Sequence, residues 1–159
     1  MKAAGASRSE RRPRHQVLLR SAVHFDLLDQ VLEQSESRIV AVKAVSRAEE
    51  YLQDHFAGFP VLPGVLMIEA LVHAGRRLVR RSGTDKVPGR LVLGGVRAVK
   101  YGRFVRPGES LIVEVTLVKE EGGVYEFKGE GRVRGADGVE VPDATAVAGR
   151  FSLRPVKIG

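Results

Sequence analysis

The 159-residue sequence contains no cysteine. This absence excludes disulfide bonds, thiolate metal sites and cysteine nucleophiles, and it fits the reducing cytoplasm in which we expect the protein to act. The sequence also lacks an uninterrupted apolar stretch near the roughly 20 residues of a membrane-spanning helix. The N-terminus has no apolar core of a secretory signal. The length instead predicts one domain with a sizeable core and no membrane partner.

Acidic residues are outnumbered, and the formal net charge is +7. Residues 1–20 hold six basic side chains and one acidic one, so the remaining 139 residues carry only +2. This nearly balanced body argues against a nucleic-acid partner. The basic segment has no apolar periodicity and is predicted to be a disordered tail, with a nucleic-acid arm or an organelle-targeting segment as alternatives. We assign residues 1–20 to the tail and 21–159 to a single domain.

One long helix is predicted among strands. Apolar residues recur at helical spacing over 64–81, where four arginines followed by Ser82-Gly83 form a C-terminal signal. Residues 25–33 fit a strand or a short helix, and residues 48–53 fit a short connection or one helical turn. About six mostly antiparallel strands with helical material on one face make an α+β arrangement. The other predicted strands are 38–46, 91–100, 110–119, 124–134 and 144–153, with glycine-containing turns at 107–108, 120–123 and 136–138.

The segment HFAGFPVLPGVLMIE, residues 55–69, carries most of the functional information. His55 lies on a loop rich in glycine and proline, and Pro63-Gly64 marks the start of the helix. Glu69 is the only charged residue between positions 61 and 72, so we expect it to point into an apolar environment without a partner. An imidazole is suited to act as a base near neutral pH, and a desolvated carboxyl group is suited to hold or deliver a proton. His55 and Glu69 are therefore the candidate catalytic residues.

Extended to HFAGFPVLPGVLMIEAL, this segment resembles the active-site signature of the β-hydroxyacyl-acyl-carrier-protein dehydratases. The resemblance covers about residues 23–153, including Lys100-Tyr101 and the turn Pro107-Gly108-Glu109, and Glu rather than Asp at position 69 favours the non-isomerising branch. It implies the hot-dog fold, in which the sheet wraps around one long central helix. It also implies dehydration of (3R)-3-hydroxyacyl thioesters on acyl carrier protein to trans-2-enoyl thioesters in fatty-acid synthesis, without a metal or another cofactor.

The implied chemistry assigns a role to each candidate residue. His55 would remove the C2 proton, which the thioester carbonyl acidifies only weakly, and Glu69 would serve the departing C3 hydroxyl group. Negative charge developing on the thioester oxygen needs donors. The N–H groups of Gly64 and Val65 at the helix start are the candidate substrate-binding donors, because such groups have no acceptor within the helix. Gly64 has no side chain to hinder the approach of the thioester.

Four departures from the family pattern bear on this assignment. The family usually has Gly at Asp54, Pro at Ala57 and often Gln at His73, and its His-Arg-Tyr-Pro segment is replaced here by Ser21-Ala22-Val23-His24. Asp54 either orients or acidifies the catalytic loop, or it signals altered substrate use. His73 lies one turn beyond Glu69, close enough to contact it by packing or by a hydrogen bond. A zinc site on the two histidines and Glu69 is disfavoured by their spacing.

Other functions stay open. A hot-dog acyl thioesterase or coenzyme A hydratase has the same fold but different polar residues. A non-catalytic acyl-carrier-binding protein is the alternative if Asp54 or the altered N-terminal segment disables the pocket. Two basic clusters compete as docking sites for an acidic carrier protein or for the phosphate of its pantetheine arm. They are Arg97, Lys100, Arg103 and Arg106 on the later segment, and Arg76, Arg77, Arg80 and Arg81 on the helix.

The predicted sheet also indicates an oligomer. A single sheet of this kind leaves an edge strand exposed and its helix partly uncovered, which predicts a homodimer or a higher even oligomer. The family resemblance implies that each site combines His55 of one subunit with Glu69 of the partner subunit.

Overall fold

The computed structural model describes residues 25–81 and 90–156. The predicted disordered tail and the helix-terminating Ser82-Gly83 lie outside these residues. Within them, no helix is long and apolar enough to cross a membrane.

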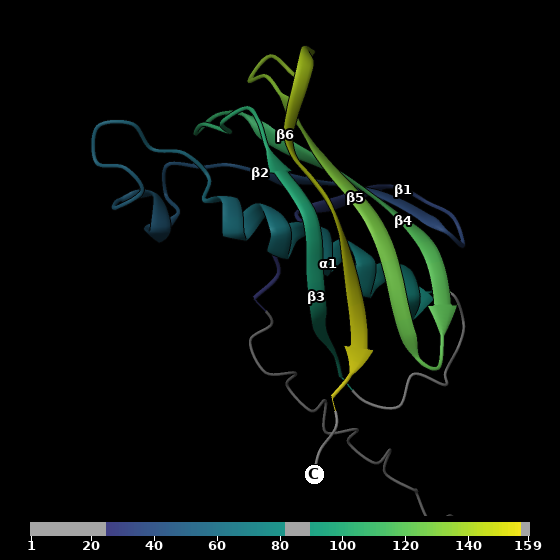
Figure 1. The fold of residues 1–159 in the computed structure, drawn as a ribbon. Helices are drawn as coiled ribbons and strands as arrows, with labels where there is room; N and C mark the ends of the chain where they lie inside the picture. Colours follow the sequence, from purple (N-terminus) through teal and green to yellow (C-terminus); the bar gives the residue numbers. More distant parts are fainter. Residues whose placement is uncertain (1–24, 82–89, 157–159) are drawn as a thin grey trace, which may run out of the picture.

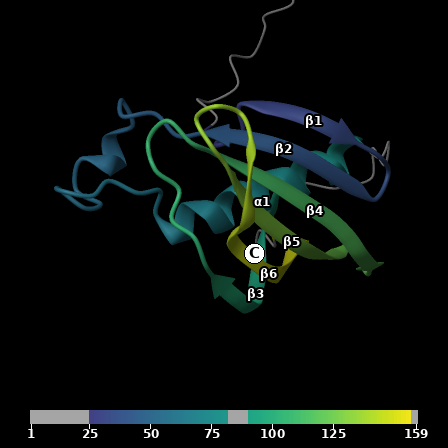
Figure 2. The same ribbon diagram turned by 90° about the horizontal axis from the view of Figure 1, so that it is seen from above.

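Six antiparallel strands form one curved sheet in the order β1-β2-β4-β5-β6-β3. The sheet curves around the helix α1 (Gly64–Arg81), which lies against one of its faces (Figure 1, Figure 2). This arrangement confirms the predicted hot-dog fold. The remaining elements are β1 (Gln30–Gln34), β2 (Arg38–Ala44), the short 3₁₀ helix η1 (Glu50–Leu52), β3 (Leu91–Tyr101), β4 (Ser110–Glu121), β5 (Val124–Arg134) and β6 (Glu140–Pro155).

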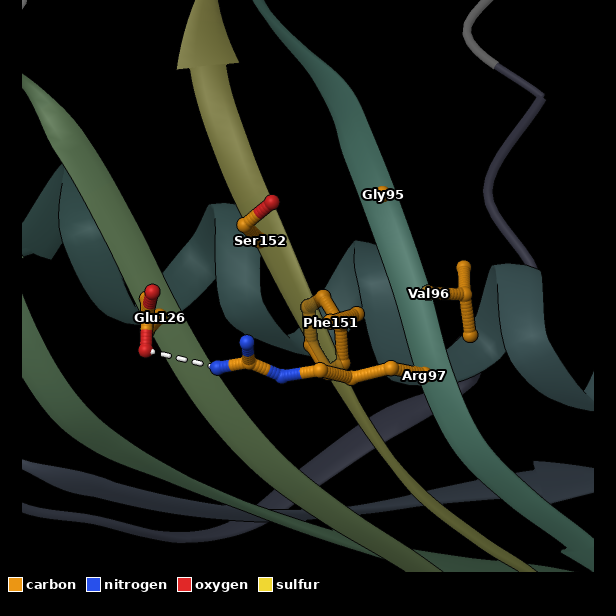
Figure 3. A pocket seen from close by; sticks show the side chains of 6 residues that line it. All are labelled: Gly95, Val96, Arg97, Glu126, Phe151 and Ser152. Atoms are coloured by element: carbon orange, nitrogen blue, oxygen red, sulfur yellow. Dashed lines mark hydrogen bonds and ion pairs between the residues drawn. The ribbon is translucent and has the colours of Figure 1, made fainter.

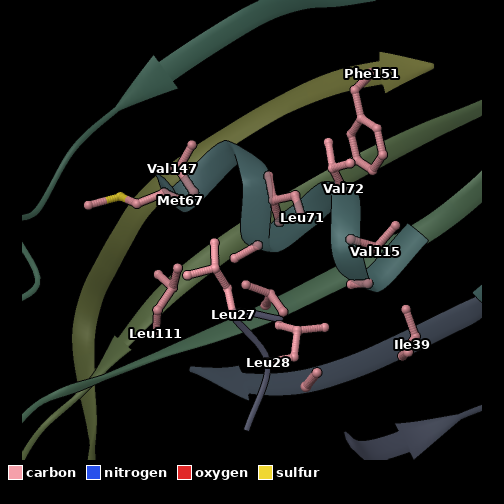
Figure 4. Packing of buried hydrophobic residues seen from close by; sticks show 14 of the residues in the cluster. Leu27, Leu28, Ile39, Met67, Leu71, Val72, Leu111, Val115, Val147 and Phe151 are labelled. Atoms are coloured by element: carbon pink, nitrogen blue, oxygen red, sulfur yellow. The ribbon is translucent and has the colours of Figure 1, made fainter. Parts of the chain in front are cut away.

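The core lies between α1 and the sheet, and side chains that alternate along the central strands form it. Leu111, Val113 and Val115 of β4 are fully buried, because side chains two apart along a strand share one face. Figure 4 shows Leu71 of α1 among side chains contributed by the sheet. The helix α1 packs closely on the sheet at Gly129 of β5, where an added Cβ atom would lie 3.1 Å from Leu71 Cδ1.

Three predicted boundaries need correction. The last strand, predicted at 144–153, runs from Glu140 to Pro155 as β6. Of residues 25–33, which fitted a strand or a helix, only those from Gln30 onward form a strand, and the residues before it are irregular. The irregular part buries Leu27 and Leu28 in the core, which explains why the sequence there is apolar without a regular period. The loop predicted at 120–123 contracts to Gly122 and Gly123, whose φ values of 59° and 79° suit a tight hairpin turn.

The strand β3 forms one edge of the sheet, and β1 forms the other. β3 is 11 residues long and pairs only with β6 within the described chain. Leu93 and Val96 on it are exposed. A long edge with unpaired backbone groups and exposed apolar side chains is a surface on which another strand can pair.

Candidate active site

His55 lies on the loop between η1 and α1, and the loop itself fixes its ring. The Nδ1 atom is 3.0 Å from the carbonyl oxygen of Val61, whose own N–H donates to the His55 carbonyl. A carbonyl oxygen can only accept, so Nδ1 carries the hydrogen of the neutral ring and Nε2 keeps a free lone pair. Leu62, which follows Val61, donates its N–H to the Val105 carbonyl. This bond joins the loop to the chain segment after β3. His55 is thus oriented to act as a base through Nε2.

A buried charge pair holds the start of this loop. The Lys43 ammonium group, on β2, donates to Glu49 Oε1 over 2.9 Å. Glu49 also accepts from the Ser46 N–H and from the Tyr51 hydroxyl group. Burial alone would raise the pKa of Glu49, but the bonds from Tyr51, Ser46 and Lys43 lower it below its ordinary value. Burial, followed by the contact with Glu49, raises the pKa of Tyr51. This cluster was not predicted from the sequence, although a lysine inside a strand of β-branched residues was its signal.

Glu69 does not have the surroundings predicted for it. We expected an isolated carboxylate in an apolar environment, but its Oε1 atom lies 3.0 Å from His73 Nε2 and 3.1 Å from Arg76 Nη1. Of its neighbours one turn away, Val72 is buried but Val65 is 73% exposed. The absence of charged residues between positions 61 and 72 therefore did not predict the surroundings of Glu69. Its partner Arg76 lies two helical turns further along α1, outside that window. Both contacts engage Oε1, and no hydrogen bond or ion pair from the described residues reaches Oε2.

His73 makes the predicted contact with Glu69 and is itself buried. Its other ring nitrogen, Nδ1, accepts a hydrogen bond of 3.1 Å from the Leu27 N–H. Asp54 is exposed and makes no hydrogen bond or ion pair with any residue in 25–81 or 90–156. Among those residues, no three histidine or acidic side chains converge as metal ligands.

The predicted substrate-binding donors, Gly64 and Val65, lie in the first turn of α1. The N–H groups of Leu66 and Met67 donate to the Pro63 carbonyl, while those of Gly64 and Val65 lie ahead of these bonds. A Cβ atom added to Gly64 would lie 2.8 Å from Cε1 of Tyr101. The absence of a side chain at this glycine therefore also makes room for the tyrosine ring.

Aromatic side chains surround the His55 loop and were not singled out from the sequence. The rings of Phe59 and Phe104 meet edge to face with centroids 5.7 Å apart, and the Arg106 guanidinium lies 4.9 Å from the Phe59 ring centre. Phe56 stacks on His55 with centroids 4.4 Å apart. Large exposed apolar groups of this kind mark a surface that a ligand or another protein covers.

A shallow hollow of about 160 Å³ lies near the edge strand β3, on the face of the sheet that points away from α1 (Figure 3). There Arg97 of β3 reaches across β6 to Glu126 of β5, with the two charged groups 3.0 Å apart. The hollow contains none of the candidate catalytic residues. It is lined by Gly95, Val96, Arg97, Glu126, Phe151 and Ser152.

Known proteins resemble this chain over most of its length. The model of the FabA-like domain family matches residues 20–143. Two curated proteins, the 3-hydroxyacyl-[acyl-carrier-protein] dehydratases FabZ of Klebsiella pneumoniae and Salmonella arizonae, are each 41% identical over 128 residues, which cover 79% of this chain and 83% of theirs.

Solved structures share the fold at lower sequence identity. The dehydratase heterocomplex ApeI:P from Xenorhabdus doucetiae is 23% identical with a TM-score of 0.61, over 82% of this chain and 83% of that chain. A hypothetical thioesterase with coenzyme A from Streptococcus pneumoniae is 10% identical with a TM-score of 0.56, over 78% of this chain and 82% of that one.

Proposed function

The chain belongs to the family of FabA-like domains, and we propose that it is a dehydratase that removes water from (3R)-3-hydroxyacyl thioesters on acyl carrier protein. The product is a trans-2-enoyl thioester, and the pathway is fatty-acid synthesis. The observation that carries the proposal is the 41% identity to the FabZ dehydratases. The family match, over residues 20–143, includes the positions of His55, Gly64 and Glu69.

The geometry supports a division of labour between the two candidate catalytic residues. His55 Nε2 takes the proton from C2, while Val61 accepts from Nδ1–H and keeps the ring in place. A proton held on Oε2 of Glu69 passes to the C3 hydroxyl group, the C3–O bond breaks as the electron pair of the C2–H bond forms the C2–C3 double bond, and water leaves. The proton taken up by His55 and the one given by Glu69 are then exchanged with solvent, which restores both groups. Negative charge developing on the thioester oxygen is stabilised by the N–H groups of Gly64 and Val65.

We propose that the active unit is a homodimer or a higher even oligomer in which the site is shared between subunits. The open edge of β3 offers a surface for pairing two sheets. Within the described chain, neither a hydrogen bond nor an ion pair joins His55 to Glu69. These two observations support a site in which His55 of one subunit faces Glu69 of the partner subunit.

The carrier protein is proposed to dock beside the His55 loop. Of the helix cluster, Arg76 already contacts Glu69 and Arg77 contacts Asp26, so their charges are partly neutralised. Arg103 and Arg106, by contrast, line a hollow of about 260 Å³ with Phe104. A basic surface next to the loop suits an acidic partner that must deliver an acyl chain to His55.

The alternative functions have less support. The likeness to a thioesterase structure rests on 10% identity and shows the fold alone. Asp54, the departure next to the catalytic histidine, is exposed and makes no contact with the His55 ring among the described residues. Asp54 thus gives no sign that the pocket is disabled, and a non-catalytic binding protein stays the second candidate only. Cytoplasmic location stays a prediction.

A spectrophotometric assay tests the proposal. Crotonyl and longer enoyl thioesters of acyl carrier protein should be hydrated, with loss of the enoyl thioester absorbance, and the matching coenzyme A thioesters should react more slowly. His55→Ala and Glu69→Gln, checked for folding by circular dichroism, are the controls. A well-folded wild-type protein that hydrates none of several chain lengths would favour the non-catalytic binding protein.

A further inference from the structure

One arginine of α1 is bound on two sides and has no task in the dehydration described above. Arg76 follows Glu69 by two helical turns, and its side chain is only 21% exposed. The guanidinium group donates two hydrogen bonds, from Nη1 to Glu69 Oε1 over 3.1 Å and from Nε to the Leu91 carbonyl oxygen over 3.2 Å. A guanidinium group is planar and rigid, so bonds from two of its nitrogens fix its orientation. Arg76 is therefore held between the candidate acid and the first residue of β3.

The bond to Leu91 anchors this arginine outside its own helix. Leu91 is buried, and it pairs with Pro155 of β6 within the sheet. An ion pair that joins two long, mobile side chains contributes little, because both must give up their freedom to form it. Here the sheet already fixes the guanidinium group. Glu69 thus meets a donor whose position does not depend on the carboxylate alone.

The two oxygens of the Glu69 carboxyl group have different surroundings. Oε1 accepts from Arg76 and also lies 3.0 Å from His73 Nε2, whereas no contact from the described residues reaches Oε2. When a carboxyl group is protonated, one oxygen carries the hydrogen and the other still accepts. An N–H donor on Oε1 disfavours a hydrogen on that oxygen, because the two hydrogens would face each other. The acid proton therefore belongs on Oε2.

The neighbouring arginines of the helix do not share this contact. Arg77 pairs with Asp26, and Arg80, one turn after Arg76, is exposed. Of the helix arginines whose side chains the structure describes, Arg76 alone contacts Glu69. The general positive charge of this part of α1 therefore does not account for the contact, and Arg80 offers a matched control.

We propose that Arg76 is a positioning residue for the dehydration. Its bond to Oε1 orients the carboxyl group of Glu69 and directs the acid proton to Oε2, from which it passes to the C3 hydroxyl group. Arg76 itself neither gains nor loses a proton, because a guanidinium group stays charged. The inference rests on the proposed function, because it assumes that Glu69 serves the reaction.

Substitutions on the helix test this role. Arg76→Met keeps an unbranched stem but donates to neither acceptor, so we expect kcat to fall about 10- to 100-fold with little change in KM, because a misplaced reacting group slows the chemical step. Arg76→Lys keeps the charge without the fork that joins Glu69 to Leu91, and its kcat should lie between those of Arg76→Met and wild type. Arg80→Met removes the same charge one turn later and should leave kcat unchanged. Melting temperatures show whether each variant is folded.

Free guanidinium ions provide a readout that a merely structural arginine would not move. Arg76→Ala leaves space beside the two acceptors, Glu69 Oε1 and the Leu91 carbonyl oxygen. Guanidinium chloride at millimolar concentrations, far below those that denature proteins, should raise the kcat of this variant several-fold. In Arg76→Met the longer side chain fills the space, so the response should be weaker. Sodium chloride at the same concentrations controls for ionic strength.

The dependence on Glu69 is tested in a double variant. If Arg76 acts through Glu69, then Glu69→Gln/Arg76→Met should be no slower than Glu69→Gln alone. A slower double variant, equal kcat for wild type and Arg76→Met, or an equal response of Arg76→Ala and Arg76→Met to guanidinium ions would overturn the inference while leaving the proposed function intact. An inactive wild-type protein would overturn the proposed function and this inference with it.

Discussion

Replacing Glu49 with alanine tests how the start of the His55 loop is held. In this variant the Lys43 ammonium, whose side chain is 9% exposed, loses its carboxylate and keeps only the Ala44 carbonyl. Breaking a buried pair by removing one partner destabilises a protein by about 3–5 kcal/mol, because the other charge stays buried. For a chain of this size that corresponds to a melting temperature lower by about 6–20 °C. Because His55 follows closely, kcat should also fall.

The matched variant removes the other partner. Lys43→Met replaces the ammonium with an apolar group and leaves Glu49 with its bonds from Ser46 and Tyr51. We expect it to lower the unfolding free energy by only about 1.5–3 kcal/mol, the contribution of one hydrogen bond to a charged group. Urea unfolding followed by circular dichroism measures both values. A Lys43→Met variant less stable than Glu49→Ala would refute the reasoning.

The pH dependence of the same pair gives an independent measurement. The pKa of Glu49 is lowered in the folded state from its ordinary value of 4.5. A carboxylate of this kind stabilises the protein above its unfolded-state pKa, and the contribution is lost as pH falls through the folded-state pKa. The difference in unfolding free energy between wild type and Glu49→Ala should therefore be constant near neutral pH and shrink below 4.5. A difference that does not shrink there would contradict the charge-pair account.

Three further outcomes test the site and the core. His55→Ala and Glu69→Gln should each be about 10²-fold slower or more, and verified heterodimers of the two should recover about half of wild-type activity; heterodimers as inactive as the parents would place both residues in one subunit. Gly64→Ala should slow hydration because its Cβ would lie 2.8 Å from the Tyr101 ring, and adding Tyr101→Ala should restore the rate unless the methyl group instead blocks the thioester. Gly129→Ala should lower the unfolding free energy in urea by about 1–3 kcal/mol, and an unchanged value would show that the helix shifts at no cost.

The sequence predicted the elements of this fold better than the surroundings of its charged groups. The range 64–81 agrees with the helix, and the alternation in 110–119 identifies the buried face of β4, because both are regular patterns of neighbouring residues. The site residues are different. The contact of Arg76 with Glu69 spans two helical turns, and the contact of Lys43 with Glu49 links a strand to a turn. Such contacts depend on the tertiary structure and on side-chain conformations, which the hydropathy pattern of neighbouring residues does not determine.

The Arg76 guanidinium group contacts both Glu69 and the edge strand β3. Its Nη1 atom contacts Glu69, while its Nε donates to the carbonyl oxygen of Leu91, the first residue of the edge strand β3, over 3.2 Å. If two subunits pair through β3, the same side chain connects the subunit interface to the acid that meets the substrate. Thermodynamic linkage then makes the two events reciprocal: a ligand bound at Glu69 changes the stability of the dimer by the same factor by which dimerisation changes the affinity for the ligand.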